Sequence, residues 1–455
     1  MTQTVNDDSG QRSSTAVLIA TSLTLFSMFF GAGNLIFPPI MGASAGTNLT
    51  PAMIGFLIGG VALPVISIIT IALSGTDIRD LVSRAGKPFG FVFSVLVYLS
   101  IGAFYALPRT GAVSFSTAVA PVIGTKSVLA SVIFNLIFFG IAFYLCWNPT
   151  NIIDSLGKVL TPILLGLLVL LVFLCLASLP ASHDAPTGEY VHNPLAAGLL
   201  EGYMTMDSIA ALAFGIIVVN AIRSLGVEEP GEVAKSTIKA GLFSSLLMAL
   251  IYVLVTMIGA QSRGLFETAA NGGEALAQIA DHYFGSGGAI ILAITVTLAC
   301  LKTAVGLITS CAQTFVKMFP NGPSYRVWAC GFCLLSFLIA NLGLNAIVAC
   351  SMPVLMFLYP LAIALILLTL CGKLFQDDPH VLRWTISLTA IAAALDFLRA
   401  LPAPLLQTLH LDQLTATLSD LIPLAAQGFG WIPFALAGFL IGMLTRAMRQ
   451  AHTSA

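Results

Sequence analysis

Residues 26–39 read FSMFFGAGNLIFPP, an apolar segment that is interrupted by Gly31, Ala32, Gly33 and Asn34. Glycine and polar residues at the depth of a bilayer are tolerated where the backbone lines a cavity inside the protein. Small residues also allow two membrane helices to pack closely, which is the competing explanation. A second interruption at a matching place in the chain favours a broken helix over close packing.

The second interruption lies at residues 201–207, which read EGYMTMD, in the sixth apolar segment. Two broken helices that are five helices apart indicate two five-helix repeats of opposite orientation, in which the first helix of each repeat is interrupted. The breaks then meet near the middle of the membrane, where secondary transporters bind their substrates. The halves share no evident sequence identity, so the repeat is predicted from helix parity and from the matched breaks.

The composition requires a membrane protein. Of the 455 residues, 58% are hydrophobic and 9% are charged, with a mean hydropathy of +0.97, and one water-soluble core cannot bury so much apolar surface. The net charge of −1 provides no basic surface for nucleic acid. The sequence has no HExxH or GxSxG motif and no carboxylate pair at membrane depth, which argues against an intramembrane enzyme. It also lacks the soluble domain that a signalling receptor would need.

Twelve apolar segments are each long enough to cross the hydrocarbon core of a bilayer as a helix. The predicted fold class is therefore an all-α polytopic membrane protein with about 12 transmembrane helices. The predicted spans are 16–45, 51–73, 89–118, 127–146, 156–177, 194–222, 238–260, 288–318, 326–342, 346–370, 382–401 and 431–446. They divide the chain into a cytoplasmic tail (1–15), a first five-helix repeat (16–177), a second, inverted repeat (194–370), two further helices (382–446) and a second cytoplasmic tail (447–455).

Basic residues predict the orientation. With the N-terminus inside, 14 of the 19 lysines and arginines fall on the cytoplasmic side and four on the outer side, and Lys302 lies in the middle of a span. Loops that carry lysine and arginine stay in the cytoplasm, so we expect both termini there, in a cell inner membrane. The four outer residues are Arg109, Lys126, Arg263 and Arg399. We interpret Arg109, which follows Pro108, as an interfacial arginine at a kink.

The first break predicts a site for the carboxylate of an amino acid. Unwinding one turn frees the amide groups of Gly31, Ala32 and Gly33 and turns the positive end of a half-helix that begins near Leu35 toward the gap. The carbonyl groups of residues 27–30, at the end of the preceding half-helix, would face a cation or the ammonium group of the substrate.

Side chains around both breaks predict an aliphatic substrate. Phe29, Phe30, Tyr105, Met204 and Met206 present apolar or amphipathic surface, against which a polar substrate would lose hydrogen bonds. A charge at this depth is costly and usually has a role. For Asp207, which ends the second break, we predict that its main role is to cap the N-terminus of the following half-helix. The predicted substrate-binding residues are Gly31, Ala32, Gly33, Asn34, Tyr105, Tyr203, Met204, Thr205, Met206 and Asp207.

Four stretches resemble the family of branched-chain amino acid:cation symporters. They are FSMFFGAGNLIFPP (26–39), LGKVLTP (156–162), GYMTMDSIAALAFG (202–215) and ANLGLN (340–345), and the similarity extends from about Leu18 to about Leu365. The resemblance implies a LeuT-like fold, uptake of leucine, isoleucine or valine by alternating access, and coupling to sodium.

The resemblance also implies where the substrate and two cations bind. The amides of Ala32 and Gly33 would bind the substrate carboxylate, with one cation beside it and a second cation between the first and eighth helices. The implied cation ligands are Phe29 and Asn34 at the first position and Ser27, Phe30, Ala299, Lys302 and Thr303 at the second.

This chain departs from the family at Lys302, where a small hydroxyl residue is usual. An ammonium group there would replace a sodium ion, which leaves a proton-coupled or uncoupled permease for methionine or another apolar amino acid as the alternative function. An ion pair of Lys302 with Asp207 or another buried acid is the structural alternative. Ala103 and Ser116 also depart from the family, which has proline and glutamate there.

The sequence predicts few further components. The coupling ion is Na+ or H+, sodium is the only metal that we expect, and no cofactor is implied. The predicted partners are the small-molecule amino acid and membrane lipid, with no nucleic acid and no obligatory protein partner.

Overall fold

The structure of the protein is a computed structural model that describes residues 29–123, 127–147, 184–224, 229–263 and 271–453, together with isolated residues elsewhere. Within these residues every regular element is a helix and no β-strand occurs. The predicted all-α class is therefore confirmed.

The helices fall into three groups along the chain. The first group is α2 (Ala32–Ala45), α3 (Leu49–Leu57), α4 (Leu63–Ser74), α5 (Ile78–Ser83), α6 (Lys87–Leu99), α7 (Ala106–Ala118), α8 (Ala120–Ile123) and α9 (Val128–Trp147). The second is α11 (Pro194–Met204), α12 (Asp207–Ser224), α13 (Pro230–Ser262), α14 (Gly272–Met318), α15 (Tyr325–Ala340) and α16 (Leu344–Leu370). The third is α17 (Gly372–Phe375), α18 (Pro379–Arg399), α19 (Ala403–Thr408), α20 (Asp412–Leu421) and α21 (Trp431–Thr453).

Eight helical stretches of the described residues are long and apolar enough to cross a membrane, and the bent pair α11 and α12 makes up to nine. One of them, Ala32–Ser74, joins the second half of the first predicted span to the whole of the second. Helix α15 is apolar but shorter. Each predicted span coincides with a helix wherever the structure describes it. The fifth, 156–177, lies outside the described residues apart from four positions, as does most of 16–28.

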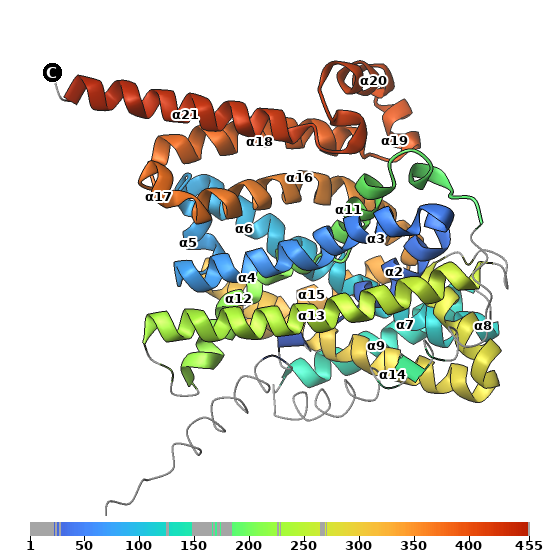
Figure 1. Ribbon diagram of the computed structural model, residues 1–455. Coiled ribbons are helices and arrows are strands. Elements are labelled where there is room, and N and C mark those ends of the chain that lie inside the picture. Colours follow the sequence, from blue (N-terminus) through green and yellow to red (C-terminus); the bar gives the residue numbers. More distant parts are fainter. Residues whose placement is uncertain are drawn as a thin grey trace, which may run out of the picture.

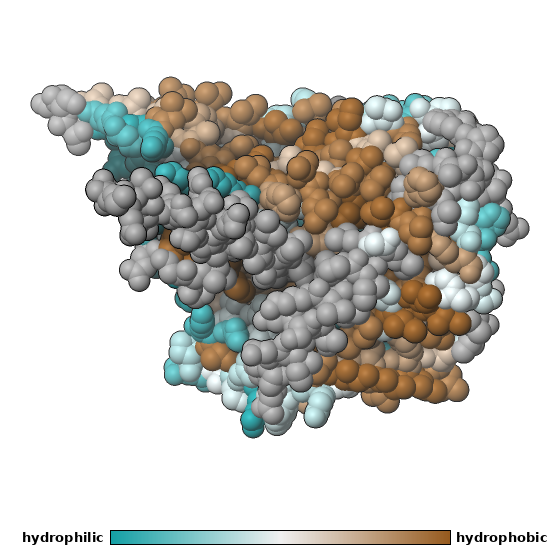
Figure 2. Space-filling model, turned by 60° about the horizontal axis from the view of Figure 1, so that its bottom comes forward, coloured by the Kyte–Doolittle hydropathy of each residue, from teal (hydrophilic) through white to brown (hydrophobic). Residues whose placement is uncertain are grey.

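The long helices lie side by side, with their ends gathered at two opposite sides of the molecule (Figure 1). Helices α5 and α17 and the C-terminal end of α21 lie at one side, whereas α8, α19 and α20 lie at the other. The sequence predicts cytoplasmic positions for the first set and outer positions for the second, so their separation agrees with the predicted alternation. Between the two ends the surface is broadly apolar, with hydrophilic residues toward the left and right edges (Figure 2).

The first predicted break exists but ends earlier than the sequence indicated. The amide of Phe30 still donates to the carbonyl of Phe26, at 2.8 Å, so helical geometry persists to the edge of the gap. Helix α2 then begins at Ala32 and not near Leu35, because the side-chain oxygen of Asn34 accepts the Gly31 amide at 2.8 Å and caps the new helix. The gap is therefore Phe30 and Gly31, and Gly33 and Asn34 belong to the first turn of α2.

The second break lies where it was predicted. Helix α11 ends at Met204 and α12 begins at Asp207, with a bend of 40° between them. Met206 has a φ of 66°, a left-handed conformation that is strained for a residue with a side chain. The Thr205 hydroxyl donates to the Gly202 carbonyl at 2.8 Å and satisfies one of the free groups at the end of α11.

A further interruption, between α6 and α7, was placed wrongly from the sequence. The chain forms a π-helical turn at residues 100–104, and Gly102 has non-helical dihedral angles (φ −86°, ψ −115°). The bend therefore precedes Pro108, which lies in the first turn of α7, where a missing amide hydrogen breaks no helical hydrogen bond. The kink that we predicted at Pro108 lies at Gly102 to Tyr105 instead.

Glycines bring α2 and α13 into backbone contact. A Cβ atom added at Gly42 would lie 2.0 Å from the Thr256 carbonyl oxygen, and one added at Gly259 would lie 2.0 Å from the Pro39 carbonyl oxygen. Such close approach between membrane helices is possible only for glycine at these positions. The contact holds Tyr252, two turns earlier on α13, beside the first turn of α2.

Candidate functional site

A small cavity of about 50 Å³ lies between the two breaks. The gap before α2, the gap between α11 and α12, and helices α7, α12 and α14 all contribute to its wall. Nine of the predicted site residues line it: Phe29, Gly31, Ala32, Gly33, Asn34, Thr205, Met206, Asp207 and Thr303. The other lining residues are Ile101, Ala106, Arg109, Thr110, Ala210, Phe214 and Leu307. The structure therefore brings together residues from both predicted breaks.

A buried polar network joins the two broken helices. The side-chain nitrogen Nδ2 of Asn34 donates to Asp207 Oδ2 at 2.9 Å, and the hydroxyl of Tyr252 donates to the same oxygen at 2.5 Å. Asn34 Nδ2 also contacts the Tyr252 hydroxyl. All three side chains are buried, with exposed fractions of 2%, 4% and 0% for Asn34, Asp207 and Tyr252. A carboxylate at this depth is thus held by two donors from two other helices.

Asp207 does not have the role that the sequence favoured. Its carboxylate accepts from Asn34 and Tyr252, whereas the amide of Asp207 itself donates to the hydroxyl of Thr205 at 3.4 Å. Thr205 therefore provides the side-chain oxygen at the start of α12, and the carboxylate of Asp207 is turned toward α2. The prediction of an N-cap for Asp207 is wrong, because the sequence did not reveal Tyr252 as a competing donor.

Arg109 lies in the wall of the cavity and not at the membrane interface. Only 4% of it is exposed. Its Nη1 atom donates to the Met204 carbonyl at 2.6 Å and its Nη2 atom lies 3.3 Å from the Thr205 carbonyl, both at the end of α11. The guanidinium also lies over the Phe37 ring, 5.2 Å from the centroid. The interfacial position that we inferred for Arg109 is therefore wrong, and without it the outer side has three basic residues.

The remaining predicted substrate residues lie behind the cavity wall. Tyr203 is stacked on Tyr359 with ring centroids 4.0 Å apart, and its side chain does not line the cavity. Met204 is buried and contributes the carbonyl that accepts from Arg109. Tyr105 is half-buried at the start of α7, outside the lining set. None of these three residues lines the cavity.

The predicted cation ligands are only partly assembled around this cavity. Phe29 and Thr303 line it, and Thr303 approaches the first break so closely that a Cβ atom at Gly31 would lie 3.1 Å from its methyl group. The Thr303 hydroxyl donates to the Ala299 carbonyl at 3.0 Å. Lys302, next to it on α14, is half-buried and does not line the cavity. Phe30 is buried outside the lining set, and Ser27 lies outside the described residues.

The ligands of a tightly held metal are not found in the described part of the chain, where no group of three or more His, Cys, Asp or Glu side chains could hold a metal ion. At the first implied cation position, the Asn34 oxygen already accepts the Gly31 amide.

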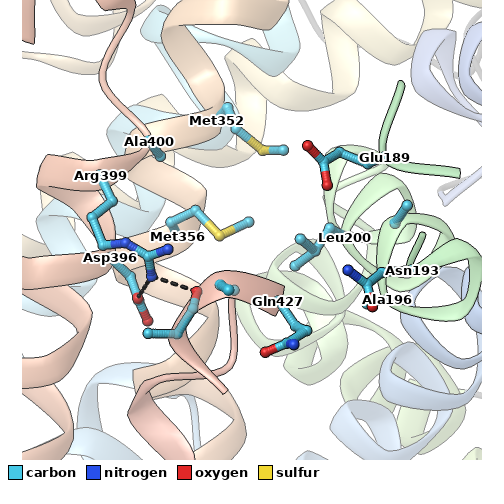
Figure 3. Close-up of a pocket in the computed structure, with 14 residues that line it drawn as sticks. Glu189, Asn193, Ala196, Leu200, Met352, Met356, Asp396, Arg399, Ala400 and Gln427 are labelled. Carbon is cyan, nitrogen blue, oxygen red and sulfur yellow. Dashed lines mark hydrogen bonds and ion pairs between the residues drawn. The ribbon is translucent and has the colours of Figure 1, made fainter. Parts of the chain in front are cut away.

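A second, larger cavity of about 310 Å³ lies at the end of the molecule where α11, α16 and α18 meet the loop at 425–428. Figure 3 shows Met352 and Met356 on one wall and Leu200, Asn193 and Glu189 opposite them. Arg399 bonds Asp396 at 3.3 Å and the Ala425 carbonyl at 2.5 Å, and so fastens this loop to the end of α18. None of the predicted site residues lines this cavity.

Two residues of the central site were missed in the sequence. Arg109 carried a usable signal, because it lies nine residues before the end of the predicted span 89–118 and so too deep for an interface. Tyr252 carried none, since tyrosine within an apolar span is ordinary and its partners lie 45 and 218 positions away.

Comparison with known proteins identifies relatives over almost the whole chain. A family model described as branched-chain amino acid transport protein matches residues 14–449. A branched-chain amino acid permease BrnQ of Lactobacillus delbrueckii subsp. lactis is 44% identical over 419 residues, which is 91% of this chain and 93% of the relative. BrnQ of Corynebacterium glutamicum is 44% identical over 94% of each chain. A branched-chain amino acid transport system 2 carrier protein of Pseudomonas aeruginosa is 37% identical over 91% of this chain and 92% of its own.

Solved structures share the fold at low sequence identity. Mhp1, a nucleobase-cation-symport-1 family transporter, in a closed conformation matches with a TM-score of 0.61 and 16% identity over 96% of this chain and 93% of its own. MhsT in complex with L-phenylalanine matches with a TM-score of 0.58 and 16% identity over 94% of this chain and 98% of its own. These matches confirm the LeuT-like fold that the family resemblance implied.

Proposed function

Since the chain belongs to the family of branched-chain amino acid transport proteins, we propose that it carries leucine, isoleucine and valine through the cavity between its two broken helices. The observation that carries this proposal is the direct link between the breaks, from Asn34 to Asp207, across one wall of that cavity. A ligand bound there contacts both halves of the fold at once, which is the arrangement that alternating access needs.

The chemistry of the cavity suits an aliphatic amino acid. The first-turn amides of α2, at Ala32 and Gly33, have no acceptor within their helix and are suited to bind an anion. The carboxylate of Asp207 offers the opposite charge for the ammonium group. Phe29, Ile101, Phe214 and Leu307 supply apolar surface, from which an apolar side chain gains and a polar one loses.

The coupling ion in this proposal is sodium, held where α14 meets the first break. Thr303 and Phe29 line the same cavity, so a hydroxyl and a backbone carbonyl are available from the two elements. The second candidate is a proton on Lys302, because this lysine precedes Thr303 on the same helix and is half-buried. Both termini are cytoplasmic in this proposal, and the membrane is the inner membrane.

Uptake of labelled leucine into proteoliposomes tests the proposal. An inward sodium gradient should drive uptake that excess isoleucine and valine suppress and that leucinamide suppresses poorly. If uptake is driven only by an inward proton gradient and is lost in Lys302→Thr, the coupling ion is the proton and not sodium. Absence of leucine uptake under either gradient, from protein that is folded and correctly inserted, would refute the function.

A further inference from the structure

Arg109 is a buried cation without a buried anion bonded to it. Its guanidinium donates to the neutral carbonyls of Met204 and Thr205, and no carboxylate among the described residues lies within 4.0 Å of it. Carbonyls at the C-terminal end of a helix carry part of a negative charge, about half a unit in all. They balance only part of the guanidinium charge. Asp207 attracts the guanidinium through space, but its carboxylate is not bonded to Arg109 and is held instead by Asn34 and Tyr252.

One donor of the guanidinium is also unused. The Nε atom of Arg109 is buried and has no hydrogen-bond partner within the described residues. Leaving a buried donor unsatisfied costs about 1–3 kcal/mol, and more when the group is charged. Phe37 covers one face of the guanidinium.

The positive end of α2 points to the same place. A Cβ atom at Gly33 would lie 2.7 Å from Nη2 and 3.0 Å from Cζ of Arg109, so the guanidinium rests against the first turn of α2. The amides of that turn, which have no acceptor within α2, and the guanidinium both place positive charge at the cavity. Asp207, on the other side, is already held by Asn34 and Tyr252.

We propose that the guanidinium of Arg109 binds the carboxylate of the transported amino acid, together with the first-turn amides of α2. This inference rests on the proposed function, because the ligand is the amino acid that the cavity carries. The planar donor edge of arginine matches a carboxylate. The substrate is then oriented by two charges, with its carboxylate at Arg109 and its ammonium group toward Asp207.

The same charge removes the need for a cation beside the substrate carboxylate. At the first implied cation position, Asn34 gives its oxygen to the Gly31 amide and its nitrogen to Asp207. A fixed guanidinium supplies the neutralising charge there, so at most the α14 position remains for sodium. Leucine binding should therefore depend on sodium with a Hill coefficient no higher than about one, and a coefficient near two would contradict this assignment.

Ligands that lack one charge test the proposal on the unchanged protein. At pH 6 the α-amine of leucinamide is protonated, so leucinamide differs from leucine chiefly by its missing carboxylate. The ligand 4-methylpentanoate, which keeps the carboxylate and the aliphatic chain, should compete with labelled leucine, whereas leucinamide and 3-methylbutylamine should compete at least about 10-fold less well than leucine. Equal competition by leucine and leucinamide would overturn the proposal while leaving leucine as the ligand.

Substitution of Arg109 tests whether this residue binds the substrate carboxylate or only stabilises the end of α11. Arg109→Gln should weaken leucine binding by about 10- to 100-fold and change leucinamide binding by less than about threefold. Arg109→Lys should lie between, since it keeps the charge and loses the planar edge. Arg263→Gln is the matched control, because Arg263 also donates to a backbone carbonyl, Ala43 at 2.9 Å, but lies outside the cavity. If Arg109→Gln remains folded and weakens both ligands equally, Arg109 is only a brace.

Discussion

At the scale of single residues, the carboxylate of Asp207 connects the two halves of the site. Its Oδ2 atom accepts from Asn34 on α2 and from Tyr252 on α13, and all three side chains are buried. Each donor fixes the direction of the carboxylate and lowers the cost of keeping it in an apolar environment. Removing one donor should therefore weaken substrate binding without removing the carboxylate.

Tyr252→Phe tests this connection. The change removes the hydroxyl that lies 2.5 Å from Asp207 and preserves the ring, and it should weaken leucine binding by about 1–2 kcal/mol, or about 5- to 30-fold. Tyr325→Phe is the matched control, because the Tyr325 hydroxyl also donates a hydrogen bond, to the Cys146 carbonyl at 3.1 Å, but lies outside the cavity. Equilibrium binding of labelled leucine to both purified variants is the measurement, and equal affinities would contradict the role of Tyr252.

The sequence revealed about half of this network. Asn34 and Asp207 were identified because a polar residue within an apolar run is conspicuous. Since the two breaks that contain them were predicted to meet, these two residues were also expected to be neighbours. Tyr252 was not identified, since no local pattern distinguishes it from other aromatic residues of a membrane helix. Arg109 was noticed and misplaced, because an adjacent proline suggested a kink where the real bend lies at Gly102.

At the scale of elements, glycine contacts set the distance between α2 and α13 and so position the network. Gly42 and Gly259 each lie where an added Cβ would be 2.0 Å from a carbonyl oxygen of the other helix. Such a contact leaves no room for adjustment by a flexible side chain, because the opposing atom belongs to the backbone.

Gly259→Ala should destabilise the protein by about 1–3 kcal/mol, since the added methyl forces α13 away from Pro39. Gly140→Ala on α9 is the control, because nothing lies within 4 Å of its added Cβ and alanine favours a helix by about 0.5–1 kcal/mol over glycine. Thermal unfolding of both variants in detergent should therefore move the midpoint in opposite directions. A midpoint for Gly259→Ala at or above that of the unsubstituted protein would show that the helices are not held at this distance.

The existence of both main breaks was predictable from the sequence, but their ends were not. Helix α2 begins three residues before the predicted start because Asn34 caps it from within, by accepting the Gly31 amide. The bend at Gly102 was hidden, since a single glycine among apolar residues looks like ordinary helix packing.

At the scale of the whole molecule, the alternation of basic loops accounts for the two ends of the fold. Figure 1 places α5 and α17 at one end and α19 and α20 at the other, as the alternation requires. The spans that the structure describes were predictable because each span needs about 20 apolar residues and the loops between them are short and polar. The absolute orientation follows only from the basic residues.

Cysteine labelling tests the orientation in intact cells, in a background without the native exposed cysteines Cys330, Cys350 and Cys371. Gln413→Cys, on exposed α20, should react with an impermeant thiol reagent from outside. Lys235→Cys, on the exposed start of α13, should react only after the membrane is permeabilised. The reverse pattern would invert the topology.

The amino acid is proposed to bind between the broken helices. Binding of labelled leucine to purified Gly33→Leu tests this position most directly. Gly33 forms the cavity wall against Arg109 and the Thr205 carbonyl, so a leucine side chain there fills the place of the substrate carboxylate. Gly306→Leu on α14 is the control, since its added Cβ would meet nothing within 4 Å. We expect Gly306→Leu to bind leucine as the unsubstituted protein does and Gly33→Leu, folded and inserted to the same extent, to bind none. Unchanged leucine affinity in Gly33→Leu would contradict this position.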